Sequence, residues 1–189
     1  MNIKAIVVAL GLASMGMQTC LPAVAGEASG ESLQAIAALD VPRYMGTWYE
    51  IAKYPNWFQK KCVSDTSAEY RAQADGRVQV INRCREASGD ISEAVGMASQ
   101  VGGADSPRLE VRFAPAWLSF LPFVWGDYWV IDLDPDYQLA AVSEPGRDYL
   151  WVLSRTREVD VKAYDALLKR LAEHGFDLGK LERTRQEAD

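Results

Sequence analysis

Histidine and cysteine are scarce in this chain of 189 residues. The only histidine is His174, which lies in a late helical pattern beside Gly175, and there are three cysteines. Metal sites built on imidazole and catalytic Ser-His or Cys-His pairs generally need a well-placed histidine. We therefore expect no metal, no cofactor and no catalytic residues, as in a binding protein that is not an enzyme.

The chain also lacks an excess of positive charge. It has 20 Lys and Arg against 26 Asp and Glu, interspersed along the sequence, for a net charge of −6. Non-specific binding to DNA or RNA depends on a basic field, so nucleic acid is not an expected partner. With 49% apolar and 24% charged residues, the composition excludes a disordered polymer and supplies a hydrophobic core for one domain.

No apolar run is long enough to cross a bilayer, which takes about 20 residues. The run at residues 5–17 follows Lys4 and precedes Ala23, Val24 and Ala25, a pattern typical of a cleaved export signal over residues 1–25. Cys20 offers an alternative, because bacterial lipoprotein signals end at a cysteine that is acylated. The residue before Cys20 is Thr19 rather than a small Gly, Ala or Ser, and this favours ordinary cleavage after Ala25.

Cleavage at that point leaves two cysteines, Cys62 and Cys84. An even pair in an oxidising compartment predicts a disulfide. It would close a loop of 23 residues and stabilise the fold by about 3 kcal/mol. Two free thiols are the alternative.

The mature chain divides into a small polar stretch at residues 26–39, typical of a flexible arm, and a domain at residues 40–189. Short apolar or alternating runs separated by turn signals predict eight antiparallel strands. They cover residues 46–53, 66–73, 77–84, 91–101, 107–113, 127–132, 138–143 and 149–155. Tight turns are predicted at residues 74–76 and 134–136.

After residue 155 the apolar period becomes helical. The stripe comprises Val161, Tyr164, Leu167, Leu168 and Leu171. Asp160 can cap the start of this helix and Gly175 suits its end. The predicted fold is all-β, an eight-stranded antiparallel up-and-down barrel (calyx) with one C-terminal α-helix packed outside.

Three segments of the chain resemble the signature regions of the lipocalin family. They are Gly-Thr-Trp-Tyr-Glu at residues 46–50, Asp-Leu-Asp-Pro-Asp-Tyr at 132–137 and Tyr-Leu-Trp-Val-Leu-Ser-Arg-Thr at 149–156. The chain is most similar to the bacterial outer-membrane and apolipoprotein D-like branches. The resemblance implies a calyx that binds a small hydrophobic molecule, with Trp48 and Arg155 packed at its closed end in a structural role. The export signal predicts a soluble protein of the periplasm, with anchoring in the outer membrane through Cys20 as the alternative.

Side chains alternate across a strand, so an inward Trp48 places Glu50 and Ala52 inward as well, and an inward Arg155 does the same for Leu153. Taking the more apolar face of the other strands, we predict these ligand-binding residues: Glu50, Ala68, Tyr70, Val80, Asn82, Val111, Phe113, Tyr128, Val142, Tyr149 and Trp151. Small residues among the inward set leave room for a ligand. A filled barrel is the alternative.

Two loops expected at the open rim are unusually apolar. The predicted rim residues are Trp57, Phe58, Lys60, Lys61, Trp117, Phe120, Phe123, Trp125 and Arg147. We expect them to contact a membrane surface or acyl chain, with the cations near a phosphate or carboxylate headgroup. A self-packed lid and a homodimer interface are the alternatives.

The resemblance favours a fatty acid or lysophospholipid, carried or stored for the cell envelope. Three other functions remain open from the sequence. They are an enzyme using Cys62 or Glu50, a haem protein with a Tyr ligand, and a protein-interaction module using the apolar rim.

Overall fold

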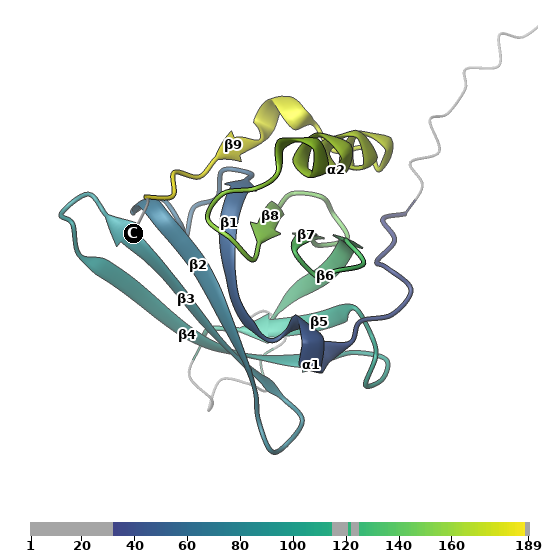
Figure 1. Ribbon diagram of the computed structural model, residues 1–189. Coiled ribbons are helices and arrows are strands. Elements are labelled where there is room, and N and C mark those ends of the chain that lie inside the picture. Colours follow the sequence, from purple (N-terminus) through teal and green to yellow (C-terminus); the bar gives the residue numbers. More distant parts are fainter. Residues whose placement is uncertain (1–31, 115–120, 122–124, 188–189) are drawn as a thin grey trace, which may run out of the picture.

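Eight strands follow one another around a closed antiparallel barrel in the computed structural model, which describes residues 32–114, 121 and 125–187 (Figure 1). Each strand pairs with the next in sequence, and β1 also pairs with β8, which closes the ring. The strands are β1 (Gly46–Lys53), β2 (Cys62–Ala72), β3 (Val78–Glu86), β4 (Ile91–Gln100), β5 (Arg108–Arg112), β6 (Gly126–Leu133), β7 (Leu139–Ser143) and β8 (Leu150–Ser154). The predicted calyx is confirmed.

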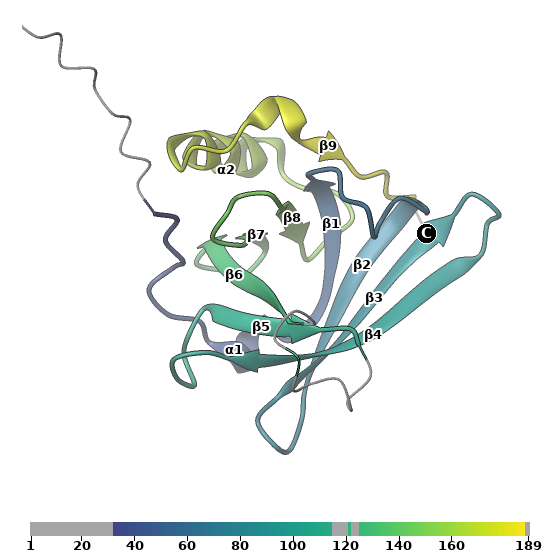
Figure 2. The same ribbon diagram turned by 180° about the vertical axis from the view of Figure 1, so that it is seen from behind.

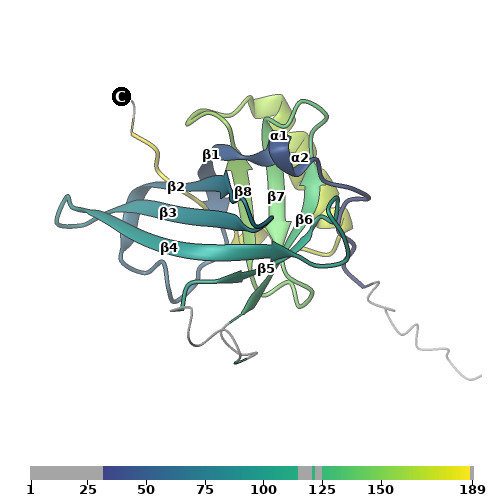
Figure 3. The same ribbon diagram turned by 90° about the horizontal axis from the view of Figure 1, so that it is seen from below.

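The ring has two different ends because its strands alternate in direction. The strands β1, β3, β5 and β7 all run toward one end, here called the open end, and β1 starts at the other, the closed end. The hairpin between β3 and β4 projects well beyond the rest of the barrel (Figure 3). The tight turn predicted at residues 74–76 joins β2 to β3 at the closed end, where Gly76 has a φ of +81°.

The predicted helix α2 (Val161–Glu173) lies across the outside of the barrel (Figures 1 and 2). The Asp160 carboxylate accepts a hydrogen bond from the backbone N–H of Ala163 and caps its start. Gly175, with a φ of +82°, ends it. Leu167 and Leu171 are fully buried against the outer face of β6, β7 and β8, so the helical stripe is the contact that holds α2 on the barrel.

Three short elements were not predicted from the sequence. They are α1 (Val41–Tyr44) at the closed end, the 3-10 helix η3 (Leu178–Lys180) and β9 (Glu182–Arg183). β9 pairs with the end of β1 outside the ring, and Figure 2 shows it beside that strand. The strand β2 also begins four residues before its predicted start, because two register irregularities between Cys62 and Ser67 hide its alternation.

A bulge in β1 corrects one inward assignment. Glu50 pairs with Leu153, but the register shifts and Ala52 pairs with Val152 rather than Trp151. Because one extra residue reverses the alternation, Ala52 packs in the apolar cluster under α2 and not inside the barrel. Lys53 takes the position beside Trp151.

The described part of the stretch predicted as a flexible arm, residues 32–39, is packed on the domain. Residues 1–31, which include the predicted export signal and Cys20, lie outside the described residues. Residues 32–39 lie against the barrel, where Leu33 packs under α2 and Leu39 packs inside the closed end. The backbone N–H of Ile36 donates to the carbonyl of Val130. Apolar residues spaced three apart, Leu33, Ile36 and Leu39, explain this packing.

Cys62 and Cys84 form the predicted disulfide, with their Cα atoms 5.5 Å apart. It joins the first residue of β2 to β3 near the open end. The alternative of two free thiols is therefore wrong. Cys62 also offers no thiol nucleophile, which removes one basis for an enzymatic reading of the sequence.

Candidate functional site: the barrel lumen and its rim

A row of inward side chains crosses one wall of the barrel. Ala68 on β2, Asn82 on β3 and Ala94 on β4 lie in register with one another and with Trp48. They alternate with outward residues, yet Ala68 and Asn82 are only half-buried and Ala94 is exposed. The Asn82 amide makes no hydrogen bond to any residue within the described part of the chain. The row is therefore only partly covered by other residues and carries one side-chain amide without a hydrogen bond in the described part of the chain.

Phe113 extends this wall beyond the end of β5. It shares a face with Leu109 and Val111, and its ring lies against Gly96 on β4. A Cβ atom at Gly96 would come within 2.8 Å of the Phe113 ring and of the Arg112 carbonyl oxygen. Only glycine at this position lets the ring approach β4, and the ring remains partly open to solvent.

Below this wall the lumen is filled. Val80 and Val142, both predicted as ligand contacts, belong to the internal apolar cluster that includes Trp48 and Leu153. Val142 has no exposed surface. The structure therefore places these two valines in the packed floor rather than on the open wall. A filled barrel describes this lower part of the lumen, and a ligand-binding space above it stays a prediction.

Trp48 and Arg155 meet at the closed end. The Arg155 guanidinium carbon lies 4.0 Å from the centre of the Trp48 ring, a cation–π contact of about 0.5–2 kcal/mol. The same guanidinium donates hydrogen bonds to the carbonyls of Arg43, Thr47 and Tyr137. Arg155 thereby connects the segment before β1, β1 itself and the loop before β7. Together with Trp48 it closes this end of the barrel, and we call the two side chains the plug.

Three tyrosine hydroxyls meet inside the barrel just above this plug. The Tyr128 hydroxyl lies 2.9 Å from that of Tyr44 and 2.8 Å from that of Tyr70. Tyr70 and Tyr128 were predicted from strand alternation. Tyr44 was missed, because it lies on α1, a single turn of helix with no sequence signal of its own.

Glu50 is a carboxylate buried at 2% exposure on the inner side of β1. Gln59, from the loop after β1, donates its amide N–H to one carboxylate oxygen at 2.7 Å, and the Thr184 hydroxyl donates to the other. Burial raises the pKa of Glu50, while these two hydrogen bonds oppose the rise. The Gln59 Oε1 atom also accepts from the Trp151 indole at 3.1 Å. The network joins the interior of the barrel to its rim and to the C-terminal segment.

That C-terminal segment, residues 182–187, fills a gap in the ring. β1 and β2 pair directly only between residues 46–49 and 67–70. Beyond that point the strands separate, and the side-chain amide of Gln186 donates to the carbonyls of Glu50 at 2.8 Å and Thr66 at 2.9 Å. One side chain thus takes over backbone hydrogen bonding that the two strands cannot make with each other.

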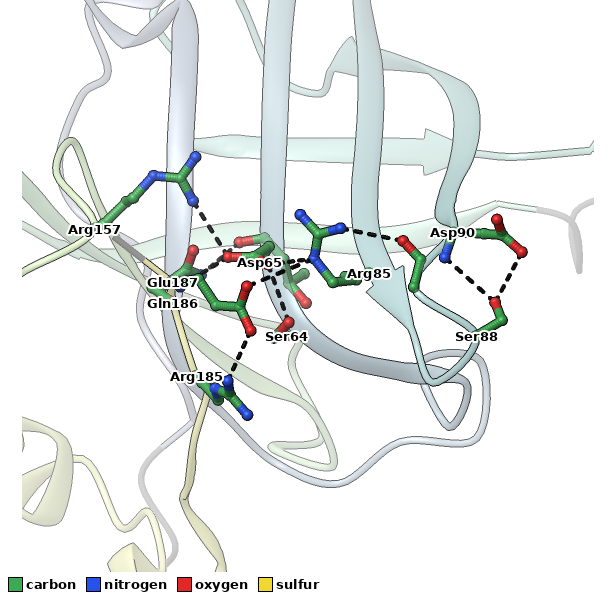
Figure 4. Close-up of polar contacts among 11 residues, drawn as sticks. Ser64, Asp65, Arg85, Ser88, Asp90, Arg157, Arg185, Gln186 and Glu187 are labelled. Atoms are coloured by element: carbon green, nitrogen blue, oxygen red, sulfur yellow. Dashed lines mark hydrogen bonds and ion pairs between the residues drawn. The ribbon is translucent and has the colours of Figure 1, made fainter. Parts of the chain in front are cut away.

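Asp65 holds the same segment from the β2 side (Figure 4). Its carboxylate accepts from Arg85 at 2.9 Å, from the backbone N–H of Glu187 at 2.8 Å and from Arg157 at 3.4 Å. Partial burial pushes the pKa of Asp65 up, but the hydrogen bonds from Glu187 and Arg85 outweigh it and the pKa is lowered. We call this seam, closed by residues 182–187 between β1 and β2, the C-terminal seal.

The rim at the open end carries aromatic side chains. Trp57 is 72% exposed and Phe58 is 44% exposed, and their rings pack edge to face. Phe58 also contacts Tyr149 and Trp151, which stack on each other with centroids 5.8 Å apart. These four rings form a continuous apolar edge from the exposed loop into the lumen.

A surface hollow of about 340 Å³ lies beside this edge. Its walls include Lys53, Trp57, Gln59, Lys60 and Glu182. The Lys53 ammonium is 3.7 Å from the Glu182 carboxylate. Lys53 was missed by sequence reasoning because the β1 bulge, which the alternation gives no sign of, turns it to this position.

Other rim predictions have different outcomes. Lys61 forms an ion pair with Glu86 at 3.0 Å. Arg147 donates to the carbonyl of His174, just beyond α2, which is a favourable place for a cation. Trp125 packs under the Arg112 guanidinium. Trp117, Phe120 and Phe123 lie outside the described residues.

The predicted ligand residues thus share the inner face of one barrel. Glu50 pairs there with Leu153, and Tyr149 stacks on Trp151. Whether any of them contacts a ligand stays a prediction. Among residues 32–114, 121 and 125–187, no cluster of His, Cys, Asp or Glu side chains could hold a metal ion. No helix in these same ranges is long and apolar enough to cross a bilayer.

An eight-stranded calyx defines a class of protein whose interior is wide enough for side chains or for one small molecule. Comparison with known proteins identifies the family within this class. The chain matches the model of a lipocalin-like domain over residues 39–186 and belongs to the lipocalin family, which binds small hydrophobic ligands. Its homologues are generally binding and transport proteins.

Individual relatives come from distant organisms. The chain is 40% identical to temperature-induced lipocalin-1 of Arabidopsis thaliana, over 82% of this chain and 84% of that protein. It is 37% identical to outer membrane lipoprotein Blc of Vibrio cholerae, over 80% and 85%. Insecticyanin from the tobacco hornworm Manduca sexta shares the fold, with a TM-score of 0.63 at 18% identity over 80% and 83%.

Proposed function

We propose that this protein binds a single-chain amphiphile, a fatty acid or a lysophospholipid, and carries or stores it in the bacterial cell envelope. The acyl chain lies in the lumen and the anionic headgroup lies at the open rim. The observation that carries the proposal is the accessible inward row of Ala68, Asn82 and Ala94. Small side chains at these positions leave the space that larger residues would have filled.

The energetics suit an acyl chain. Burying about ten methylenes at about 0.8 kcal/mol each gives about 8 kcal/mol before ordering costs. That gross figure corresponds to a dissociation constant on the order of micromolar, and the ordering costs weaken it. The open end supplies the charge, since Lys53 and Lys60 border the hollow beside Trp57. A phosphate or carboxylate there would lie next to cations, whereas the carboxylate of Glu50 faces the interior.

Titration with a fluorescent fatty acid, 11-(dansylamino)undecanoic acid, tests the proposal. Ala94→Trp fills the lumen, and Val95→Trp adds the same ring to the outer face of the same strand, where Val95 is 50% exposed. Ala94→Trp is expected to weaken binding at least tenfold while Val95→Trp leaves it unchanged. Equal binding by both variants, with unchanged circular dichroism, would show that the probe lies outside the lumen.

Contact with a membrane surface is a second proposed property, favoured by the exposure of Trp57 and Phe58 beside Lys60. Aromatic side chains flanked by lysines suit the interface of an anionic bilayer. Replacing Trp57 and Phe58 by Ser should abolish binding to phosphatidylglycerol vesicles. Val161→Ser is the matched control, because Val161 is 70% exposed on α2. Unchanged vesicle binding by the double variant would favour a lid or a dimer interface instead.

We further propose export to the periplasm with cleavage after Ala25, and lipid anchoring through Cys20 in the outer membrane as the alternative. The relative from Vibrio cholerae is an outer membrane lipoprotein, which favours the alternative. The intact mass of the protein purified from its native envelope separates the two. A mass that begins at Gly26 supports the soluble form, and an acylated Cys20 supports the anchored one.

A further inference from the structure

The three tyrosine hydroxyls form a bar across the lumen. In the ring of eight strands, β2 and β6 are separated by three strands in either direction, so they stand on opposite walls. Tyr70 extends from β2 and Tyr128 from β6, and their hydroxyls meet at 2.8 Å. Tyr44 joins them from α1 at the closed end. A ligand that enters from the open end must end at this bar, because the space behind it is packed.

The bar has one more O–H group than it has hydrogen bonds between its members. Three phenols carry three O–H groups, and the two oxygen–oxygen contacts consume two of them. No further hydrogen bond of these hydroxyls is found among the residues that the structure describes. Tyr128 is the central member and the only one of the three that is not fully buried. When Tyr44 and Tyr70 both donate to it, its own O–H is free to donate into the lumen, strengthened by the two bonds it accepts.

The bar stays neutral. Burial raises the pKa of Tyr70 to about 12 and raises the pKa values of Tyr44 and Tyr128 as well. The charge of Arg155 acts on Tyr44 and Tyr70 and opposes this rise, but its guanidinium is engaged over Trp48 and with three carbonyls. The floor therefore offers a hydrogen-bond donor without a positive charge that would balance a carboxylate. A neutral acceptor oxygen fits it best.

We propose that the bar of Tyr44, Tyr128 and Tyr70 is a specificity site for an acceptor oxygen, such as a ketone, ether or ester oxygen, at the buried end of the ligand. This rests on the proposed function, since it requires a chain in the lumen. It narrows the ligand from any fatty acyl chain to oxygenated ones. An unsubstituted chain would place a methyl group against the unpaired O–H and leave the donor unsatisfied.

Two ligands of equal length test the inference. They are octadecanoic acid and 17-oxo-octadecanoic acid, which carries a ketone next to its terminal methyl, and each displaces the dansyl probe. The wild-type protein is expected to bind the keto acid more tightly than the plain acid. Replacing Tyr44, Tyr70 and Tyr128 together by Phe keeps the ring shapes and removes all three protons. That variant is expected to bind the keto acid about tenfold more weakly, with binding of octadecanoic acid within twofold.

All three hydroxyls must be removed together. Any row of hydrogen-bonded phenols, whether of three, two or one, has one more O–H group than contacts between its members, so one O–H remains available to the ligand. Removing both partners of a buried hydrogen bond is close to neutral for stability, so the triple variant is expected to fold. Tyr54→Phe is the matched control, since Tyr54 is buried under α2 and donates to the carbonyl of Asp177 outside the lumen. It should leave the preference between the two acids unchanged.

Infrared spectroscopy of the wild-type complex needs no variant. The ketone stretch of 17-oxo-octadecanoic acid, labelled with ¹³C at the ketone, should fall below its position in hexane when the bar donates to it. A stretch at the hexane position, or an unchanged preference in the triple variant, overturns the inference while the lumen proposal stands. Failure of both acids to displace the probe instead overturns the proposed function.

Discussion

Replacing Gln186 by Ala tests whether the C-terminal seal holds the barrel together. The Gln186 amide donates two hydrogen bonds, to the carbonyls of Glu50 and Thr66, where β1 and β2 do not pair. Each bond contributes about 0.5–1.5 kcal/mol net, and an unsatisfied buried carbonyl costs about 1–3 kcal/mol. Freeing the glutamine side chain returns up to about 1.5–2 kcal/mol of rotamer entropy. The balance is a loss of about 1–2 kcal/mol, or roughly 2–8 °C in Tm.

The assay is urea unfolding of the oxidised protein, followed by tryptophan fluorescence. Arg185→Ala is the matched control, because Arg185 is exposed and its side chain pairs only with Glu187 in the described structure, a contact of at most about 0.5–1 kcal/mol. Gln186→Glu should cost more than Gln186→Ala at neutral pH, since it turns an oxygen toward two carbonyl oxygens. Part of that extra loss should be recovered in acid, when the carboxyl can donate again. Equal unfolding free energies for Gln186→Ala and Arg185→Ala would refute the role assigned to the seal.

Three further changes have defined outcomes. Because the pKa of Glu50 is raised in the folded state, the wild-type protein loses stability as pH rises through the interval from the unfolded to the folded pKa. In urea unfolding, the unfolding free energy of Glu50→Gln relative to that of the wild type should therefore be higher at pH 7.5 than at pH 4.5. Gly96→Ala should destabilise by about 1–3 kcal/mol and weaken binding of the dansyl fatty acid, because its Cβ meets the Phe113 ring at 2.8 Å. Replacing Cys62 and Cys84 by Ala should cost about 3 kcal/mol in thermal unfolding.

Each of these has its own control and contrary result. For Glu50→Gln, an identical effect at both pH values would mean that the carboxyl titrates alike in the folded and unfolded protein. For Gly96→Ala, the comparison is Gly126→Ala, whose Cβ would meet only the Val111 carbonyl, at 3.9 Å. If the two glycine variants bind equally well, the Phe113 ring is not part of the binding wall. For the disulfide, reduction of the wild-type protein should reproduce the loss.

Alternation along the strands was a good guide wherever the ladder is regular. It put Ala68 and Asn82 on one face, and the register of β2 and β3 confirms that they share it. It failed at Ala52, because a bulge inserts one residue and reverses the faces beyond it. It also could not distinguish an open wall from a packed floor. Val142 faces inward as expected, yet its neighbours bury it completely.

The sequence by itself determined the barrel, the outer helix, the disulfide and the inward face of most strands. These follow from local periodicity, turn residues, cap residues and the count of cysteines, all of which can be seen within short segments. The tertiary structure alone decided what lies at the two ends of the lumen. Glu50 accepts a hydrogen bond from Thr184, which is 134 residues away in the sequence, and the hydroxyls of Tyr128 and Tyr44 are in contact although the two residues are 84 positions apart. Such contacts depend on how distant segments pack together, and no local pattern specifies that.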